Sequence, residues 1–342
     1  MSAFGGTRRL RAFAGSLASI PITLFGLILV TFVIGRVMPI DPVIAIVGDH
    51  APPDVVAHVR AELGLDRPLP VQFLIYVRRL AEGNLGHSVM TSNNVTSDIL
   101  QYFPRTFELA TAAILIATLI GVPAGVMAAA RPGSRFDHLV RVVSLTGQSI
   151  PVFVLGLIFL LVFYAELGWL PGSGQIGVFY DGTVPTITGM LVVDAALTGN
   201  WDAFQSALAH LIQPALVLAL FSLAYITRMT RAFMLEALGS EYIVTARAKG
   251  MPERVVLWRH AFGNISVGLV TVLALAYASL LEGAVLTETV FGWPGLGLYL
   301  TTSLLNADMN AVLGATLVIG FIYVALNLLA DLAYRLLDPR VR

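Results

Sequence analysis

The sequence contains no cysteine and little charge of either sign. Without cysteine, the chain can form no disulfide and can supply no thiolate as a nucleophile or metal ligand. Charged residues make up 12% of the 342 residues and apolar residues 57%, and the mean hydropathy is +0.81. This composition is too apolar for a soluble globular domain. We therefore expect an integral membrane protein, and its formal net charge of 0 gives no indication of a nucleic-acid partner.

Lysine is almost absent as well, since Lys249 is the only one. The phosphate-binding loop of nucleotide hydrolases needs a lysine followed by serine or threonine after a glycine-rich turn, whereas Lys249 is followed by Gly250. Histidines occur at positions 50, 58, 87, 138, 210 and 260, and no two are four residues apart. The sequence therefore predicts no ATPase site, catalytic residue, cofactor site or metal site in this chain.

Uncharged runs of about 20 residues are long enough to cross the hydrocarbon layer of a membrane. Six such runs occur: Ala12–Gly35, Leu109–Ala130, Val142–Ala165, Ala203–Thr227, Ala261–Leu281 and Met309–Ala330. We expect an all-α membrane protein with six transmembrane helices, the first over residues 12–37. Its apolar core is too long for a cleavable signal peptide. A shorter apolar stretch, Gly182–Val193, contains Pro185 and is expected to be a surface or re-entrant segment.

Basic residues in short loops mark the cytoplasmic side of a membrane. They lie before the first run, between the second and third, between the fourth and fifth, and after the sixth, whereas Gly168–Asp202 and Val290–Asp308 contain none. Both termini, residues 1–11 and 339–342, are therefore expected in the cytoplasm. Residues 38–104 are expected outside as a small periplasmic cap, because Asp54–Leu63 and Val71–Leu80 have helical periodicity. Residues 105–338 would form the remaining core.

Prolines interrupt two of the apolar runs. Ser149-Ile-Pro151 lies in the third run and Gln213-Pro214 in the fourth. Proline within a membrane helix predicts a kink, because it removes a backbone donor. Such kinks occur in helices that line a cavity and also in ordinary helix packing, and the sequence leaves both interpretations open.

The charged interval Glu241–Phe262 lies between the fourth and fifth runs, within the cytoplasmic segment 228–262. Gly250 after Lys249 predicts the end of one helix and Pro252 the start of the next, which gives helix, elbow and helix on the membrane surface. Ala246, Ala248 and Gly250 would let the first helix lie close in a partner's groove, with charges from Glu241, Arg247 and Lys249 at the rim. A solvated amphipathic loop is the alternative.

This interval resembles the EAA loop of ABC-importer permeases, and Thr245–Gly250 resembles the dipeptide, oligopeptide and nickel subfamily. Val244 and Gly263 depart from the general EAA pattern. The resemblance covers nearly the whole chain and is closest to the first dipeptide permease subunit. Further matching segments are Asp41-Pro42, Glu62–Gln72, Gly83–Gly86, Arg228–Arg231, Glu288–Gly297 and Leu337–Arg340.

The resemblance implies a type I ABC-importer permease fold in the bacterial inner membrane. It implies a second, homologous permease as heterodimer partner, two cytoplasmic ATPases that bind ATP and Mg, and an external solute-binding protein. The expected function is import of dipeptides or small oligopeptides by alternating access; nickel or glutathione import and, from another class, an ion-coupled secondary transporter remain alternatives. The implied ATPase-coupling residues are Glu241, Tyr242, Thr245, Ala246, Arg247, Lys249 and Gly250.

Two further hypotheses concern the outer half of the protein. Glu282 is an acid directly after the fifth apolar run, near the outer part of that span, where a charge inside the bilayer is functional by default. It would face the substrate pathway and attract a cationic group such as a peptide amino terminus, unless it is shallow enough to be hydrated. Phe291, Trp293 and Pro294 would form a re-entrant elbow at the outer gate, or else an aromatic anchor at the membrane interface.

Overall fold

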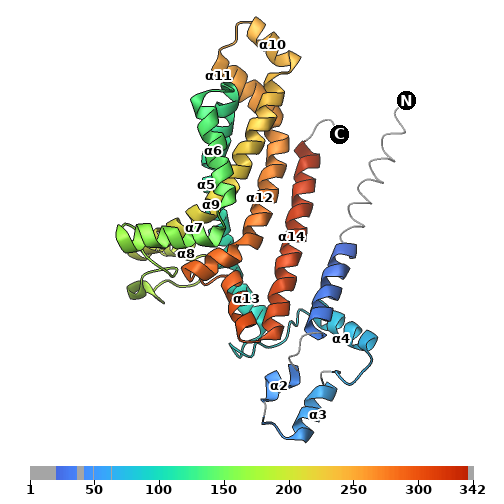
Figure 1. The fold of residues 1–342 in the computed structure, drawn as a ribbon. Helices are drawn as coiled ribbons and strands as arrows, with labels where there is room; N and C mark the ends of the chain where they lie inside the picture. Colours follow the sequence, from blue (N-terminus) through green and yellow to red (C-terminus); the bar gives the residue numbers. More distant parts are fainter. Residues whose placement is uncertain (1–20, 37–41, 49, 63, 338–342) are drawn as a thin grey trace, which may run out of the picture. The chain divides into compact units, whose positions relative to one another are not determined.

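The computed structural model describes residues 21–36, 42–48, 50–62 and 64–337. Within these ranges the chain is helical, and its only strand-like pairing is a single antiparallel bridge between His87 and Asn94 (Figure 1). The predicted cytoplasmic segments 1–11 and 339–342, and the start of the first predicted span, lie outside the described residues. The chain divides into unit 1 (residues 1–101 and 299–325) and unit 2 (residues 102–298 and 326–342).

Four described helices are long and apolar enough to cross a membrane. They are α5 (Val95–Ala130), α9 (Trp201–Leu238), the continuous helix Glu253–Phe291 and, from α14 (Met309–Leu337), the part Met309–Ala330. Shorter apolar helices cover Pro21–Arg36, Val152–Glu166 and Leu296–Leu305. Six of these seven helices overlap the six predicted spans, and α5, α9 and the helix from Glu253 extend well beyond the uncharged runs that predicted them. The seventh, Leu296–Leu305, lies in a segment that was expected outside the membrane.

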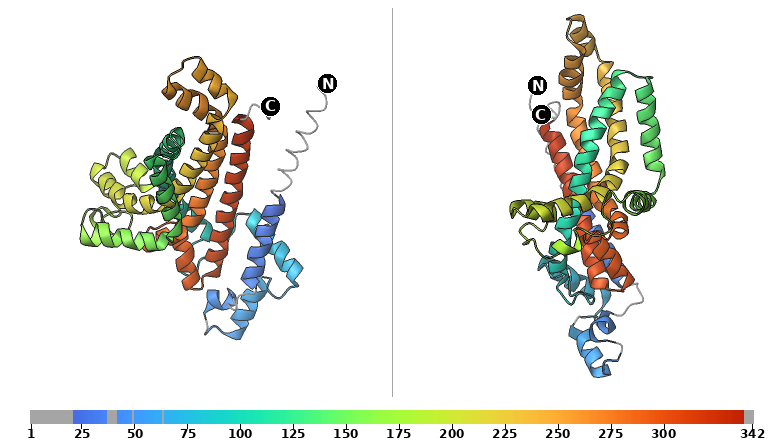
Figure 2. Two further views of the ribbon diagram at one scale, coloured as in Figure 1. Left: turned by 45° about the horizontal axis from the view of Figure 1, so that its top comes forward. Right: turned by 90° about the vertical axis from the view of Figure 1, so that its left-hand side faces the viewer.

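The third predicted span, 142–165, is not one straight helix. It is divided between α6 (Arg135–Ser149) and α7 (Val152–Phe159), and α7 continues into the π-helical segment η1 (Leu160–Glu166). Ile150 and Pro151 adopt ψ angles of 125° and 136° because a residue before proline disfavours the helical conformation and Pro151 cannot donate to the preceding turn. As a result α6 runs alongside α9 and α7 runs across it (Figures 1 and 2). In contrast, α9 remains helical through Pro214.

Unit 1 contains the helices that were predicted in residues 38–104. They are α3 (Pro53–Glu62) and α4 (Leu69–Ala81), and a further helix that was not predicted, α2 (Pro42–Val47), precedes them. Phe73 of α4 contacts Phe25 and Phe32 of the helix Pro21–Arg36, with ring centroids 5.9 and 5.2 Å apart. Two buried carboxylates, Asp98 and Asp308, fix the connection that follows α4, because they accept hydrogen bonds from side chains of the segment 88–93.

Unit 2 contains α5 from residue 102 onward, α6, α7, α8 (Leu191–Leu197), α9, α10 (Glu241–Ala248), α11 (Glu253–Val255), the π-helical segment η3 (Val256–Ala261), α12 (Phe262–Phe291) and the end of α14 from residue 326. Helices α5 and α9 approach closely where glycines of α5 meet threonines of α9. A Cβ on Gly125 would lie 2.7 Å from the Thr227 carbonyl oxygen and from the Thr230 Cβ. Only glycine fits there, so the sequence Gly121-Val-Pro-Ala-Gly125 fixes this helix crossing.

Candidate functional site

The elbow between α9 and α12 has the form that the sequence predicted. Helix α10 begins after Ser240, and its last turn ends at Gly250, whose φ of +75° is strained for any other residue. Pro252 precedes the first residue of α11, Glu253. The second helix is longer than expected, however, because α11 and η3 continue into α12 without interruption. The elbow is therefore attached directly to a membrane-crossing helix.

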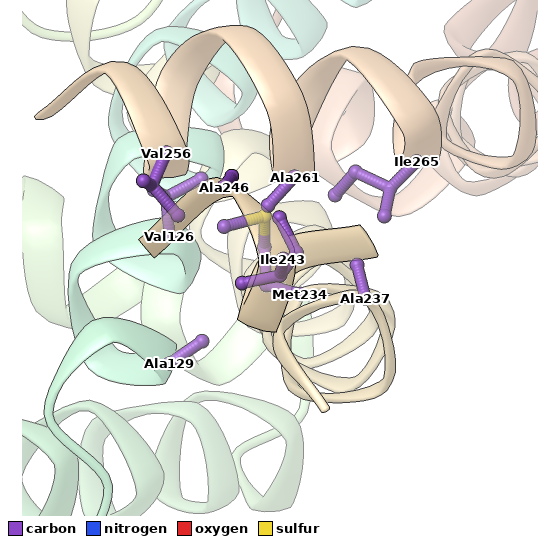
Figure 3. Close-up of a cluster of buried hydrophobic side chains, with 9 residues drawn as sticks. All are labelled: Val126, Ala129, Met234, Ala237, Ile243, Ala246, Val256, Ala261 and Ile265. Carbon is purple, nitrogen blue, oxygen red and sulfur yellow. The ribbon is translucent and has the colours of Figure 1, made fainter. Parts of the chain in front are cut away.

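One face of α10 packs inside the chain. Ile243 and Ala246 are 0% and 7% exposed and belong to a cluster of buried apolar side chains, here called the elbow cluster (Figure 3). The other members come from α5, α9, η3 and α12: Val126, Ala129, Met234, Ala237, Val256, Ala261 and Ile265. Because protein interiors are close-packed and deform little, the elbow cluster fixes α10 to the ends of three long helices.

The opposite face of α10 is exposed. It presents Glu241, Tyr242, Thr245, Arg247 and Lys249, and Gly250 is exposed at the end of the helix. Six of the seven predicted coupling residues therefore lie on an open surface. The seventh, Ala246, is a correction: its methyl group was expected on the exposed face, but it is buried in the elbow cluster, where its small size serves packing within this chain.

An ion pair joins the two sides of the elbow. Arg247 Nη2 lies 2.6 Å from Glu253 Oε1, and Arg247 Nε donates to Glu253 Oε2 over 3.2 Å. Both side chains are about half exposed, so the pair contributes little stability by itself. The pair holds α10 against α11 across Gly250. The Arg247 guanidinium, which was expected at the rim of a partner's groove, is therefore bound to Glu253 within this chain.

A buried ion pair lies near the elbow, between α6 and α9. Arg231 Nε and Nη2 donate to the two oxygens of Asp137 over 2.6 and 3.0 Å, and the Asp137 side chain is 1% exposed. The hydrogen bond from Arg231 lowers the pKa of Asp137 to about 2, despite burial, which acts in the opposite direction. The sequence identified Arg231 as one of the basic residues between the fourth and fifth runs and as part of a family segment, but it did not identify its partner, 94 residues away.

The predicted outer elbow is buried, which corrects the interpretation of its aromatic residues as a membrane-interface anchor. Phe291 and Trp293 are 1% and 0% exposed, and Trp293 Nε1 donates to the Arg105 carbonyl oxygen over 3.0 Å. Gly292 ends α12 with a φ of +58°. Pro294 is half-buried, and its carbonyl oxygen accepts a hydrogen bond from Arg105. These side chains hold the turn together and do not offer an exposed aromatic surface.

Glu288 organises this elbow and was not singled out from the sequence. Its fully buried carboxylate accepts hydrogen bonds from the Thr106 hydroxyl over 2.6 Å and from the Leu298 N–H over 2.9 Å, at the start of α13 (Leu296–Leu305). A Cβ on Gly295 would lie 2.5 Å from the Glu288 carboxylate, and one on Gly297 would lie 2.9 Å from it. The glycines of the segment Glu288–Gly297 therefore make room for a buried acid.

Glu282 lies six residues before Glu288 on α12 and has a different environment. Its side chain is exposed, and it has no hydrogen-bond or ion-pair partner among the described residues. Within the described part of the chain, no group of three or more histidine, aspartate or glutamate side chains is arranged to hold a metal ion.

The fold is that of an ABC-importer permease. The structure is similar to a permease chain of the MetNI methionine ABC transporter in an inward-facing conformation, with a TM-score of 0.51 and 18% sequence identity over 68% of this chain and 93% of that one. The family model for the binding-protein-dependent transport system inner membrane component matches residues 121–342, and the model for its N-terminal part matches residues 10–110.

Known relatives cover almost the entire chain. The probable D,D-dipeptide transport system permease protein DdpB of Escherichia coli is 44% identical over 92% of this chain and 93% of its own. The di/tripeptide transport system permease protein DppB of Pseudomonas aeruginosa is 43% identical over 94% of this chain and 95% of its own. The dipeptide transport system permease protein DppB of Escherichia coli is 40% identical over the same shares.

The chain belongs to the family of binding-protein-dependent transport system inner membrane components. It is a multi-pass inner-membrane permease subunit of an ABC importer and not itself an enzyme, because ATP is hydrolysed by separate ATPase subunits. Membership of this family implies a partner permease, ATPase subunits and a solute-binding protein. It favours the importer over the ion-coupled secondary transporter that the sequence alone left open.

Proposed function

We propose that this chain pairs with a homologous permease as a heterodimer that carries dipeptides and small oligopeptides inward, powered by two cytoplasmic ATPases that bind ATP and Mg. The names of the relatives support the substrate class, because the three described above are named for dipeptides, di- and tripeptides and D,D-dipeptides. An external binding protein would deliver the peptide. This chain would supply the passage and the surface on which an ATPase acts.

The observation that carries the mechanism is the two-sided character of α10. Its open face, with Tyr242, Thr245 and Lys249, is the contact surface for an ATPase, and its buried face is fixed by Ile243 to the elbow cluster. A displacement of the ATPase would therefore move α10 together with the ends of α5, α9 and α12. Packed helices respond to such a displacement by shear or hinge movement, which is what alternating access requires.

The proposed orientation places the elbow and both termini in the cytoplasm. Arg228, Arg231, Arg247, Lys249, Arg254 and Arg259 surround the elbow, whereas the segments that follow α7 and α12 contain no lysine or arginine between residues 168–202 and 290–308. The segment Phe291–Gly297 then lies outside. In this proposal it contributes to the outer gate by moving with α12 as a packed turn, because Phe291 and Trp293 are buried.

The test is reconstitution of the complete importer in liposomes. Peptide uptake and ATP hydrolysis stimulated by the loaded binding protein are measured for the wild type, for Thr245→Trp on the open face of α10, and for Leu119→Trp on the exposed face of α5. We expect Thr245→Trp to abolish both activities by obstructing the ATPase contact and Leu119→Trp to retain them. Full coupling in Thr245→Trp would contradict the docking surface. Uptake of nickel or glutathione but not of peptides would contradict the substrate class.

A further inference from the structure

The carboxylates of α5 and α12 fall into two groups. Asp98 and Glu108 of α5 and Glu288 of α12 are buried, and each accepts two or more hydrogen bonds. Glu282 is the exception, because it is exposed and has no partner among the described residues. Helix α12 contains no lysine, arginine or histidine that could neutralise it. Every other acid of α5 and α12 is therefore buried and hydrogen-bonded, and Glu282 alone is exposed and without a partner among the described residues.

Glu282 belongs to a polar stripe along α12. The exposed positions of the outer half of α12 that share its face are three and four residues apart, so they lie along one side of the helix. They are Leu275, Ser279, Glu282, Leu286 and Thr289. In α5 the exposed positions from residue 107 to 130 are all apolar: Phe107, Leu115, Leu119, Ile120 and Met127. The open face of α5 has the composition of a lipid contact, whereas the stripe of α12 does not.

The position of Glu282 along α12 gives its carboxylate access to water. It follows Phe262 by 20 residues, which is about 30 Å along the helix and close to the thickness of the hydrocarbon layer. Phe291, at the end of α12, is about 13 Å further on. Glu282 is thus near the outer boundary of the hydrocarbon layer, where a carboxylate reaches water, and Ser279 and Leu275 continue the stripe inward from it.

We propose that the polar stripe of α12 lines the aqueous pathway and that the carboxylate of Glu282 binds the ammonium group at the amino terminus of the transported peptide. The identity of the bound group as a peptide amino terminus rests on the proposed function. The exposure of the polar stripe to water does not depend on it. Charge complementarity selects the occupant, because an unpaired carboxylate on a helix without cations attracts a cationic group.

The first experiment tests the stripe without any substrate. The chain has no cysteine, so single cysteines placed in it react alone. In the assembled importer, Ser279→Cys and Leu119→Cys are treated with a cationic and an anionic water-soluble methanethiosulfonate, and labelling of this chain is followed by mass. We expect Ser279→Cys to react and Leu119→Cys to remain unlabelled. Lack of reaction at Ser279→Cys in every nucleotide state would overturn the aqueous pathway.

The same reagents measure the charge of Glu282. At Ser279→Cys the cationic reagent should react faster than the anionic one. A charge roughly 4 Å away in water changes each rate by about five-fold, in opposite directions, so the two rates should differ by about thirty-fold. Adding Glu282→Gln should remove this preference, whereas Glu166→Gln, at an exposed glutamate of η1, should not. An unchanged preference in the Glu282→Gln background would show that this carboxylate does not control the local potential, and the inference would fail.

The second experiment tests binding of the ammonium group. With saturating loaded binding protein, we expect Glu282→Gln to reduce the maximal rate of dipeptide uptake about ten-fold while stimulated ATP hydrolysis persists, and Glu282→Asp to recover part of that rate. Wild-type uptake by Glu282→Gln would refute the ammonium contact. If the wild type itself transports no peptide but Ser279→Cys still shows the charge preference, then the proposed substrate is wrong and the charged aqueous stripe stands.

Discussion

The hydroxyl of Thr106 on α5 donates a hydrogen bond of 2.6 Å to the carboxylate of Glu288 near the end of α12, and the same hydroxyl oxygen accepts the Leu296 N–H over 2.8 Å. One side chain of α5 thus joins the end of α12 to the start of α13. An unpaired buried carboxylate would be destabilising, so these contacts and the two glycines around them form a single structural unit.

Gly295→Ala should destabilise this unit. The new methyl group would lie 2.5 Å from both the Glu288 carboxylate and the Thr106 hydroxyl, so the hydrogen bonds of the carboxylate would be displaced. We expect a loss of about 2 kcal/mol or more in the free energy of unfolding. Unfolding in detergent micelles measures it, with Gly283→Ala of α12 as the control, because a methyl group there meets nothing within 4 Å. Equal stability of the two variants would argue against a tight fit of Gly295 beside the Glu288 carboxylate and the Thr106 hydroxyl.

Asp137→Asn should weaken the attachment of α6 to α9. It removes the charge that accepts two hydrogen bonds from Arg231, and we expect a cost of about 1–3 kcal/mol at neutral pH. The pKa of Asp137 is lowered to about 2 in the folded protein, against roughly 4 in an unfolded chain. The contribution of the carboxylate is therefore complete above about pH 4 and is lost as the pH falls towards 2.

The measurement for Asp137 is the unfolding free energy of wild type and variant between pH 7 and pH 2. Their difference should shrink over the lower part of this range. Arg141→Ala is the matched control, because Arg141 is half exposed and lies 3.9 Å from the same carboxylate, so its loss should change stability by less than about 1 kcal/mol. A difference between wild type and Asp137→Asn that persists unchanged to pH 2 would exclude the charge as its cause.

Gly250→Ala should strain the elbow without any steric clash. No atom lies within 4 Å of the position a methyl group would take, but the φ of +75° costs a non-glycine residue about 1 kcal/mol. Gly239→Ala, at the end of α9 with a φ of −80°, should be tolerated. The stimulated ATPase activity and the thermal midpoint of the two variants can be compared directly. Identical behaviour would mean that the turn relaxes to another conformation at little cost.

Ile243→Ala and Val244→Ala should separate the two faces of α10. Ile243 is fully buried in the elbow cluster and Val244 is 60% exposed next to it. Truncation of the buried side chain should cost about 2–5 kcal/mol and loosen the attachment of α10, so that less peptide is carried per ATP hydrolysed. The exposed truncation should leave stability within about 0.5 kcal/mol. Unaltered coupling in Ile243→Ala would show that the elbow cluster does not transmit the movement.

The sequence predicted those features that depend on local chemistry. Gly250 and Pro252 marked the elbow correctly, and helical periodicity located α3 and α4. Ser149-Ile-Pro151 indicated a disturbance, but whether a proline bends or ends a helix depends on tertiary packing, and here Pro151 separates two helices while Pro214 does not.

Contacts between residues distant in sequence could not be predicted in this way. The partners of Arg231 and Glu288 are 94 and 182 positions away, and nothing in the local pattern identifies them. The burial of Ala246 could not be predicted from the sequence either, because α10 is short and has small residues on both faces, so the pattern does not show which face is buried. The alternative interpretation of Phe291 and Trp293 as an interface anchor was wrong for the same reason, because aromatic residues suit a buried turn as well as a membrane interface.

The uninterrupted helix from Glu253 to Phe291 spans 39 residues, or about 58 Å. Over that length, a tilt of only 5° about one end displaces the other by about 5 Å, nearly the pitch of an α-helix. A rotation too small to disrupt the contacts at the Glu253 end would thus produce, at the Phe291 end, a displacement comparable with the size of an amino-acid side chain.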